Sequence, residues 1–204
     1  QHSQSLYNMF AAIPGVKVVV PSNPYDAKGL LMSAIQEDNL VVFSEDKTLL
    51  GQKGNVPEEP YTIEIGKANV TREGDDLTIV AIGKMVAVAE ETAEKLAEDQ
   101  VSVEVIDLRS VSPWDQETVL DSVKKTGRLI VIDESNPQCN IAGDVASVIG
   151  DVGFDYLDGP IKKVTAPDTP VPFAANLEAA YMPNADKVLD IASELIDDLK
   201  KANA

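Results

Sequence analysis

The chain has 204 residues, of which 44% are hydrophobic and 25% are charged, as in ordinary globular proteins and unlike disordered ones. Its 34 acidic and 17 basic residues give a formal net charge of −17. This charge argues against nucleic-acid or anionic-membrane binding, because both need a basic surface. One cysteine excludes an intrachain disulfide and suits a reducing compartment, so we expect a cytoplasmic protein. The polar opening Gln1–Ser5 runs directly into apolar sequence, and we expect the chain to begin within a domain.

The first 50 residues predict a strand, a helix and a second strand. Val16–Val20 is a short apolar run typical of a buried strand, and Leu40–Ser44 is another. Between them, Asn23 followed by Pro24 indicates a helix start, because asparagine caps helices and proline fits the first helical position. A helix between two strands predicts parallel strands joined by a right-handed crossover.

The middle of the chain predicts a linker followed by an edge strand. Residues 51–60 are polar and contain glycine and proline, as linkers do. Tyr61–Val70 alternates weakly between polar and apolar residues, which favours an edge strand. Residues 73–76 are one glutamate, one glycine and two aspartates, so a turn is expected there.

From residue 77 onward the sequence alternates strands and helices. The expected strands are 77–82, 101–108, 129–132 and 160–165, and the expected helices are 85–96, 142–149 and a last one through residue 199. A further helix follows Ser112–Asp115, with Asp115 in its first turn, and ends at Gly127. Three prolines between residues 167 and 172 predict an irregular arm, after which Asn184 caps the last helix.

The common chemical motifs are missing from the sequence. One cysteine and one histidine cannot form a metal-binding cluster, and the glycines lack the spacing of a dinucleotide fingerprint. Cys139 follows acidic rather than basic residues, so we interpret it as a structural or incidental thiol. Trp114 stands at a helix start and is interpreted as a packing residue. From the residues alone, the chain is an acidic α/β protein with two domains.

Five stretches carry a resemblance to a known family: Gln1–Ser5, Ile13–Pro21, Asp26–Leu31, Val105–Arg109 and Lys125–Leu129. The chain resembles, over essentially its whole length, the β subunit of the thiamine-diphosphate-dependent 2-oxoacid dehydrogenases. These are the decarboxylating first components of the pyruvate, branched-chain and acetoin dehydrogenase complexes. The chain is most similar to the acetoin dehydrogenase branch, on the stretches 133–139, 154–158 and 165–173.

The resemblance implies an α/β fold in three parts. Residues 1–50 would be the end of a transketolase-like pyrimidine-binding domain, and 51–76 a linker with an edge strand. Residues 77–204 would be a transketolase C-terminal-like domain, with a mostly parallel sheet flanked by helices. The family's activating glutamate and other early pyrimidine-pocket residues have no counterpart here. We therefore assign no cofactor-binding residue and expect this chain alone to be inactive.

The resemblance also implies a reaction, cofactors and partners. The intact enzyme would hold thiamine diphosphate with Mg²⁺ at the interface of an α₂β₂ tetramer. It would cleave the C–C bond next to a carbonyl and transfer the acyl group to lipoyl-lysine. The partners would be the α subunit, a second β subunit and the dihydrolipoamide acyltransferase core, through its peripheral binding domain and lipoyl domain. Acidic residues of the last helix, such as Glu194, would steer that docking, although a solvated face is the ordinary reading.

Five positions match functional residues of the family. His2 matches the active-site histidine, whose imidazole relays a proton, although a lone histidine near a chain end is ordinarily just solvated. Ala34, Ile35, Glu37 and Asn39 match a loop that holds a monovalent cation, usually potassium. Carbonyls at a helix end lack intrahelical partners and suit a cation, although the same residues also read as an ordinary helix end. The family commonly has aspartate where this chain has Glu37.

Other functions stay open at this point. The chain could be a non-catalytic module for β–β dimerisation and acyltransferase docking. Its parent could act on pyruvate or a branched-chain 2-oxoacid instead of acetoin. It could also be the C-terminal domain of a transketolase or deoxyxylulose-phosphate synthase, but the equivalent stretches of those single chains lack this pairing of Gln1–Ser5 with Ile13–Pro21.

Overall fold

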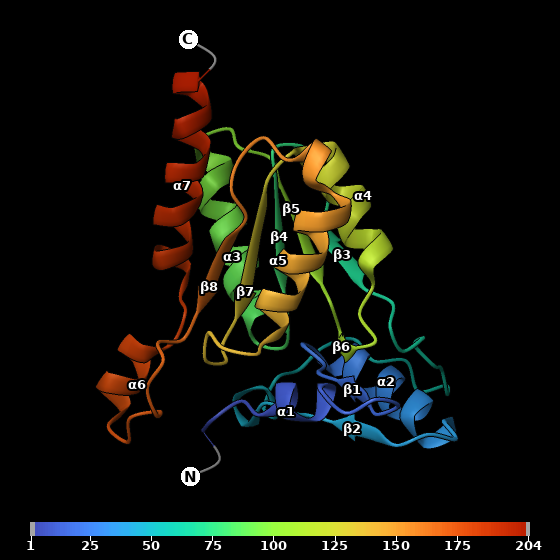
Figure 1. Cartoon of the computed structure of the whole chain (residues 1–204). Coiled ribbons are helices and arrows are strands. Elements are labelled where there is room, and N and C mark those ends of the chain that lie inside the picture. Colours follow the sequence, from blue (N-terminus) through green and yellow to red (C-terminus); the bar gives the residue numbers. More distant parts are fainter. Residues whose placement is uncertain (1–2, 203–204) are drawn as a thin grey trace.

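The computed structural model describes residues 3–202, with side chains described through residue 196. It has two units, each built around its own sheet (Figure 1). The larger sheet has the strand order β3-β5-β4-β7-β8, and the smaller has the order β2-β1-β6. Within residues 3–202, none of the helices has the length and hydropathy needed to cross a bilayer.

The larger sheet is mostly parallel. Its strands are β3 (Asn69–Arg72), β4 (Leu77–Ala81), β5 (Val103–Asp107), β7 (Leu129–Asp133) and β8 (Lys162–Thr165). β4 pairs in parallel with both β5 and β7, β7 pairs in parallel with β8, and β3 adds an antiparallel edge to β5. Every residue of β4, β5 and β7 is buried. Such continuous burial is expected of parallel strands that are covered on both faces.

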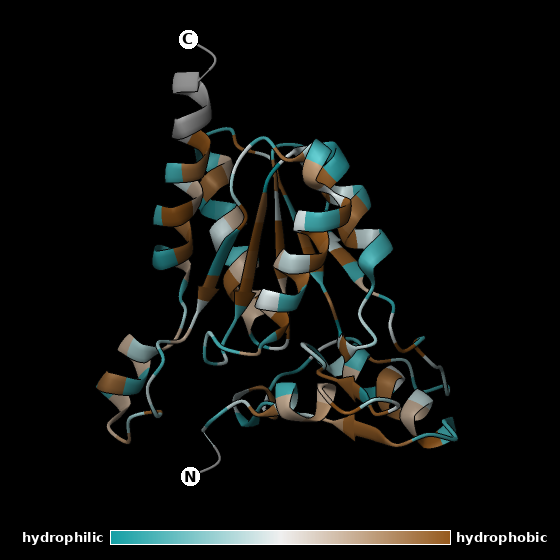
Figure 2. Ribbon diagram, viewed as in Figure 1, coloured by the Kyte–Doolittle hydropathy of each residue, from teal (hydrophilic) through white to brown (hydrophobic). Residues whose placement is uncertain are grey.

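Helices cover both faces of this sheet. They are α3 (Met85–Glu98), α4 (Gln116–Thr126), α5 (Ile141–Val152) and α7 (Ala185–Ala202). In Figure 1, α3 and α7 lie on one face of the sheet, and α4 and α5 lie on the other. Figure 2 shows the apolar strands between the apolar sides of these helices. The cluster on the α4–α5 face continues into the smaller unit through Tyr7, Val18 and Val111.

The smaller unit is completed by a strand from the second half of the chain. Its elements are α1 (Tyr7–Ala11), β1 (Lys17–Val19), α2 (Pro24–Gln36), β2 (Val41–Phe43) and β6 (Ser110–Ser112). β1 pairs in parallel with β2, as the crossover predicted, and antiparallel with β6. Asn23 caps α2 by accepting a hydrogen bond from the amide of Asp26 at 2.9 Å, which confirms the predicted helix start.

The predicted edge strand over Tyr61–Val70 is wrong in its first part, because β3 begins only at Asn69. Residues 61–63 instead lie against α2. The amide of Ile63 donates to the carbonyl of Gly29 at 3.2 Å and to Ser33 Oγ at 3.1 Å. A Cβ at Gly29 would lie 2.6 Å from the side chain of Ile63, so this close contact needs glycine. Tertiary packing therefore overrides the weak alternation of the sequence.

Other local predictions were confirmed or corrected. Asp115 is the N-cap of α4 and accepts from the amide of Thr118 at 3.2 Å, so it precedes the first turn in which it was predicted. Gly127 ends α4 at a φ of 68°, and Asn184 caps α7, both as predicted. Three short elements were not predicted: α1, β6 and α6 (Ala175–Tyr181), which lies within the proline-rich arm. The 3₁₀ turns Lys47–Leu49 and Phe154–Tyr156 were also not predicted.

Candidate functional site

The carboxyl ends of β5, β4 and β7 meet the smaller unit (Figure 1). β4 is followed by α3 on one face of the sheet, and β7 is preceded by α4 on the other. The connections therefore change direction between β4 and β7. In open α/β sheets, ligands bind outside the carboxyl ends of the strands at such a switch point. Here residues of the smaller unit lie over it.

The loop that follows β7 binds the N-terminal segment. We call Asp133–Asn136 the β7 loop and Gln4–Asn8 the N-terminal segment. The Tyr7 hydroxyl donates to Asp133 Oδ1 at 2.5 Å, and Asn8 Nδ2 donates to Ser135 Oγ at 2.9 Å. Burial, and then the carboxylate of Asp133, raise the pKa of Tyr7 well above its usual value, so this hydroxyl is a donor throughout the physiological range.

A lysine at the end of β4 joins acidic residues of both units. Lys84 Nζ lies 2.6 Å from Glu134 Oε2 and 3.1 Å from Asp46 Oδ2. Burial raises the pKa of Glu134 above its usual value, against the opposing effect of Lys84. Burial acts to lower the pKa of Lys84, but its bonds to the two carboxylates raise it overall. The charges of Lys84, Asp46 and Glu134 are thus paired with one another between the two units.

A second network lies at the end of β5. Asp107 is fully buried and accepts from Ser22 Oγ at 2.5 Å and from the amide of Arg109 at 2.8 Å. The Arg109 guanidinium donates to Asp26 Oδ1 at 2.6 Å, near the start of α2. Burial raises the pKa of Asp107 to about 7, against the opposing hydrogen bonds from Ser22 and Arg109. The network therefore ties β5 to the start of α2.

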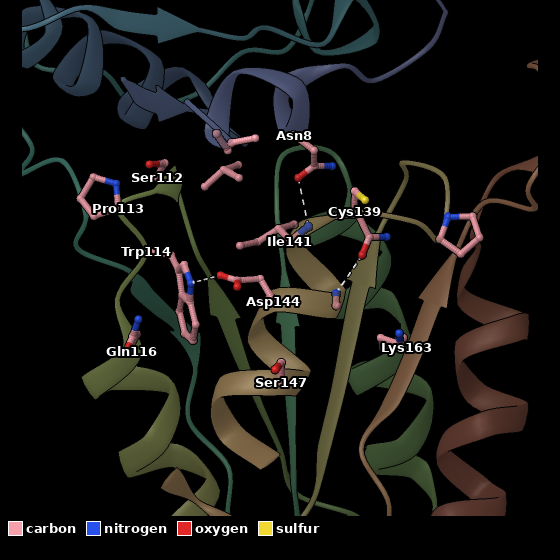
Figure 3. A pocket seen from close by; sticks show the side chains of 16 residues that line it. Asn8, Ser112, Pro113, Trp114, Gln116, Cys139, Ile141, Asp144, Ser147 and Lys163 are labelled. Atoms are coloured by element: carbon pink, nitrogen blue, oxygen red, sulfur yellow. Dashed lines mark hydrogen bonds between the residues drawn. The ribbon is translucent and has the colours of Figure 1, made fainter. Parts of the chain in front are cut away.

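Two hollows flank α1. One, of about 660 Å³, lies over the switch point and is lined by Ser3, Asp46, Lys84 and Glu134 among others. The other, of about 700 Å³, lies between α1 and α5 (Figure 3). In Figure 3, the indole nitrogen of Trp114 donates to Asp144 Oδ2 at 2.7 Å, which agrees with a packing role for this buried ring.

Of the predicted site residues, the structure describes those at the end of α2. His2 lies outside the described residues. The other four predicted residues lie around the end of α2: Ala34 and Ile35 in its last turn, Glu37 at its C-cap and Asn39 beyond it. Glu37 is bonded to Lys17 Nζ and accepts from Asn39 Nδ2 at 3.1 Å, and these two bonds lower its pKa. A cation at this helix end would therefore compete with Lys17, and the potassium site stays a prediction.

The hollow over the switch point is lined by acidic and basic side chains. Among residues 3–196, no three histidine, cysteine, aspartate or glutamate side chains are placed to hold a metal together. The hollow's carboxylates Asp46 and Glu134 are both paired with Lys84.

Sequence reasoning missed the polar residues of the junction. Lys84, Asp107 and Asp133 each end or follow a predicted buried strand, and parallel strands bring their carboxyl ends to one edge. That placement was the signal that could have found them. Their partners Tyr7 and Ser22 carry no such signal, because the contacts cross more than 80 residues of sequence.

Comparisons with known proteins define the class of this fold. Residues 66–188 match the family described as the transketolase C-terminal domain, and residues 1–53 match the transketolase pyrimidine binding domain. The chain belongs to the transketolase C-terminal domain family. A solved split-gene transketolase, described as an inactive β₄ tetramer, superposes with a TM-score of 0.80 at 24% identity. The superposition covers 94% of this chain and 60% of that one and supports the fold alone.

Particular relatives are more similar in sequence. The β subunit of acetoin:2,6-dichlorophenolindophenol oxidoreductase is 55% identical in Bacillus subtilis (strain 168), over 96% of this chain and 57% of the relative. The subunit of the same name in Cupriavidus necator is 48% identical, over 92% of this chain and 56% of the relative. The pyruvate dehydrogenase E1 component subunit β of B. subtilis is 47% identical, over 96% of this chain and 60% of the relative. The chain thus spans less than two thirds of the length of these relatives.

Proposed function

We propose that the chain is the C-terminal part of the β subunit of a thiamine-diphosphate-dependent acetoin dehydrogenase. The supporting observation is a gradient of identity to three proteins of one bacterium. Identity is 55% to the acetoin subunit, 47% to the pyruvate subunit and 42% to the 2-oxoisovalerate dehydrogenase subunit β. The enzyme would cleave the C–C bond next to a carbonyl and transfer the acyl group to lipoyl-lysine. The alternative substrates are pyruvate and branched-chain 2-oxoacids.

In this proposal the cofactor is held mostly by other parts of the enzyme. Thiamine diphosphate with Mg²⁺ would sit between the α and β subunits and supply the carbanion chemistry. The contribution of this chain is His2, whose imidazole would hold or release a proton beside the reacting group. The chain alone would be inactive, because the activating glutamate of the family has no counterpart in it.

A substrate panel tests the proposal. The full-length β subunit, assembled with its α subunit, would be given acetoin, pyruvate and 2-oxoisovalerate, and acyl-lipoamide formation would be measured. The highest kcat/KM is expected for acetoin. A preference for either 2-oxoacid would overturn the substrate assignment. Turnover by the 204-residue chain without an α subunit would overturn the assignment of the cofactor site to other parts of the enzyme.

A variant tests the role of the histidine. His2→Ala in the full-length enzyme should lower acyl transfer by roughly 10²- to 10⁴-fold, the usual worth of a general acid or base. Affinity for thiamine diphosphate should stay the same. Asp99→Asn, at the end of α3, is the control and should match wild type. Lost cofactor affinity with normal transfer per bound cofactor would contradict this role.

The second candidate function is that of an assembly module. The net charge of −17 favours electrostatic docking of a basic acyltransferase domain, and the same chain would form the β–β contact. Raising salt from 0.1 to 1 M shortens the Debye length from about 10 to about 3 Å, so the acyltransferase complex should weaken. The apolar β–β contact should persist. Sedimentation at both salt concentrations tests this, and a salt-insensitive complex would contradict it.

The potassium proposal has its own test. If a cation binds at the end of α2, then K⁺ should raise the thermal midpoint above that in tetramethylammonium, which is too large for such a site. Lys17→Met should strengthen the effect, because it removes the cation that now pairs with Glu37. Glu37→Gln should weaken it. Equal midpoints in both salts for all three proteins would exclude the site.

A further inference from the structure

We propose that Asp107, Asp26 and Arg109 form a proton-controlled hinge between the two units, which fixes their relative orientation when Asp107 is protonated and loosens when Asp107 is charged. The inference does not depend on the reaction proposed above. It assigns a regulatory task to a buried carboxyl group that the proposed reaction does not use. Its basis is the path of the chain between the two sheets and the charges buried along that path.

The chain passes directly from the larger sheet to the smaller one at residues 108 and 109 (Figure 1). β5 ends one residue before Leu108, and β6 begins one residue after Arg109. The amide of Leu108 donates to the carbonyl of Ala81 in the larger sheet at 3.0 Å. The carbonyl of Arg109 accepts from the amide of Val20, which follows β1 in the smaller unit, at 2.8 Å. Neighbouring residues are thus bonded to different units, and any change in the orientation of the units must turn the backbone between them.

The hinge residue has a strained backbone that its own contacts hold in place. Arg109 lies in the left-handed region, at a φ of 58°. Residues with a Cβ are uncommon in this region, and such strain persists only where the surroundings hold the residue. The amide of Arg109 donates to Asp107 Oδ1 at 2.8 Å, and its guanidinium donates to Asp26 Oδ1 at 2.6 Å. The conformation of the hinge therefore depends on two carboxyl groups.

The same groups belong to a closed ring of hydrogen bonds across the junction. Ser22 Oγ donates to Asp107 Oδ2 at 2.5 Å. Asn23 Nδ2 donates to Ser22 Oγ at 3.0 Å and to Asp26 Oδ2 at 2.8 Å. Arg109 completes the ring, because it bonds to Asp26 through its guanidinium and to Asp107 through its amide. The ring joins the end of β5, the start of α2 and the hinge, so a change at one carboxyl group reaches both units.

The ring holds more acidic than basic groups in a buried place. Asp107 is 0% exposed and Asp26 is 1% exposed, and the charged groups that act on Asp107 are Asp26 from α2 and Arg109 from the hinge. The neighbouring strands β3 and β4 place the uncharged Asn69 and Ala81 beside it. With both carboxyl groups ionised, one negative charge would be buried without a partner, which is costly. Burial raises the pKa of Asp107 to about 7, which agrees with this count of charges.

The guanidinium of Arg109 can change its partner when Asp107 loses its proton. It bonds to Asp26 through Nη2, whereas its Nε is buried and has no hydrogen-bond partner among the described residues. While Asp107 is neutral, Asp26 attracts this guanidinium without competition from it. Once Asp107 is charged, the two carboxylates repel one another and compete for one cation. The bond of Arg109 to the start of α2 then weakens, and the smaller unit is less firmly oriented.

The first measurement is the titration of the Asp107 carboxyl group by carbon-13 NMR in the 204-residue chain, with a midpoint expected at about pH 7. Asp26→Asn removes the repelling charge and should lower the midpoint by about one pH unit or more. Ser22→Ala removes a donor to the ionised form and should raise it. Asp115→Asn is the matched control, because Asp115 is a buried carboxylate whose bonds lie outside the ring, and it should match wild type. A wild-type midpoint near 4, the ordinary value of aspartate, would overturn the proposal.

The second measurement follows the orientation of the two units. Nitroxide labels on Cys139, the exposed natural thiol of the larger unit, and on Leu40→Cys, at an exposed position of the smaller unit, report their separation by double electron–electron resonance. The distance distribution should be broader at pH 8.5 than at pH 5.5, whereas adding Asp107→Asn should keep it narrow at both.

Ser22→Ala keeps the experiment decisive if Asp107→Asn does not fold. In this variant the broadening should move to higher pH by the same amount as the titration of Asp107. Asp115→Asn should broaden as the parent does. A distribution that stays constant while Asp107 titrates would overturn the hinge. Broadening that persists in Asp107→Asn, or that ignores the shifted titration in Ser22→Ala, would assign the response to other groups and overturn the proposal as well.

Discussion

The two sheets of this protein are buried to different degrees. Every residue of the central strands β4, β5 and β7 is buried, and helices cover both faces. In the smaller unit, β2 is only half-buried along its length, and α2 with the residues after it exposes Leu31, Ile35 and Leu40. The free energy of folding should therefore come mostly from the larger unit. The smaller unit depends on its contacts with the larger one.

Those contacts are of two kinds. One apolar cluster runs from the α4–α5 face into the smaller unit. Beside it lie several polar links, among them those that connect Tyr7 to Asp133, Ser22 to Asp107, and Asp46 through Lys84 to Glu134. Polar bonds depend on geometry and on protonation, whereas apolar burial does not. The junction should therefore respond to pH and to single polar substitutions more than either sheet does.

Truncating one leucine in each unit gives the largest contrast. Leu129 on β7 is 0% exposed, so Leu129→Ala should lower the free energy of unfolding by about 2–5 kcal/mol through lost burial and a cavity. Leu40, beside β2, is 65% exposed, and Leu40→Ala should change it by no more than about 0.5 kcal/mol. Urea unfolding measures both. Equal losses would show that the smaller sheet is as important for stability as the larger one.

The junction predicts a pH effect from Asp107. Because its pKa rises from 3.8 in the unfolded chain to about 7 when folded, the folded state binds the extra proton between these values. Stability from this group is therefore present at pH 4 and is lost as pH rises to 7, by at most about 4 kcal/mol. Asp107→Asn, which resembles the protonated form, should remove this slope.

The quantity to measure is the difference between wild type and Asp107→Asn at each pH from 4 to 8, because other carboxylates contribute their own slopes. Asp46, for example, has a pKa below its usual value: burial raises it, but the Thr48 and Lys84 bonds outweigh burial. A difference that is constant with pH would show that Asp107 is charged in the folded protein throughout this range.

Lys84, which lies between the units, should contribute less to the free energy of unfolding than Asp107 does. Lys84→Met leaves Glu134 buried without its cation, which should cost about 1–3 kcal/mol of unfolding free energy. Lys95→Met is the matched control within the larger unit, since Lys95 pairs with Glu91 and Asp186 at the surface, where ion pairs contribute little. Thermal unfolding at neutral pH compares them. A control as harmful as Lys84→Met would contradict a special role for the junction.

Removing a helix cap should have the smallest effect on stability, but the two caps should differ in which part of the chain exchanges faster. Asn23 caps α2 and Asn140 caps α5, each through one amide, so either alanine variant should cost about 1 kcal/mol. Asn140→Ala should lower protection across the larger unit, whereas Asn23→Ala should speed amide exchange mainly in α2. Exchange followed by mass spectrometry resolves the two. Identical exchange patterns would mean that both units unfold as one.

Much of this arrangement was predictable from local sequence. The apolar runs of β1, β4 and β7 and the caps at Asn23 and Asn184 follow from periodicity and capping chemistry, and the structure confirms them. The order of the larger sheet was not predictable, because β7 does not pair with β5, the strand of this sheet that precedes it in the chain, but with β4. The α/β class followed from the alternation of strands and helices, whereas the transketolase-like architecture came from the resemblance of longer stretches, such as Ile13–Pro21.

The candidate site was predictable only in part. His2 and the residues at the end of α2 were predicted through the resemblance alone, and they stay predictions. The polar junction was missed, because hydroxyl donors such as Tyr7 and Ser22 look ordinary in sequence until the fold brings them to a buried carboxylate. The strand β6 was missed for a similar reason, since three residues form a strand only when a distant partner supplies the hydrogen bonds.

That distant pairing has a consequence for synthesis on the ribosome. Ser110 pairs with Val19, so one edge of β1 has no partner until β6 emerges. At about 5–20 residues per second, the intervening stretch of about 90 residues takes roughly 5 to 18 s to make. During this interval an apolar strand with an open edge is exposed, which invites pairing with other nascent chains. The smaller unit stays incomplete until residue 112 has been made, so chaperone demand should fall once that residue has left the exit tunnel.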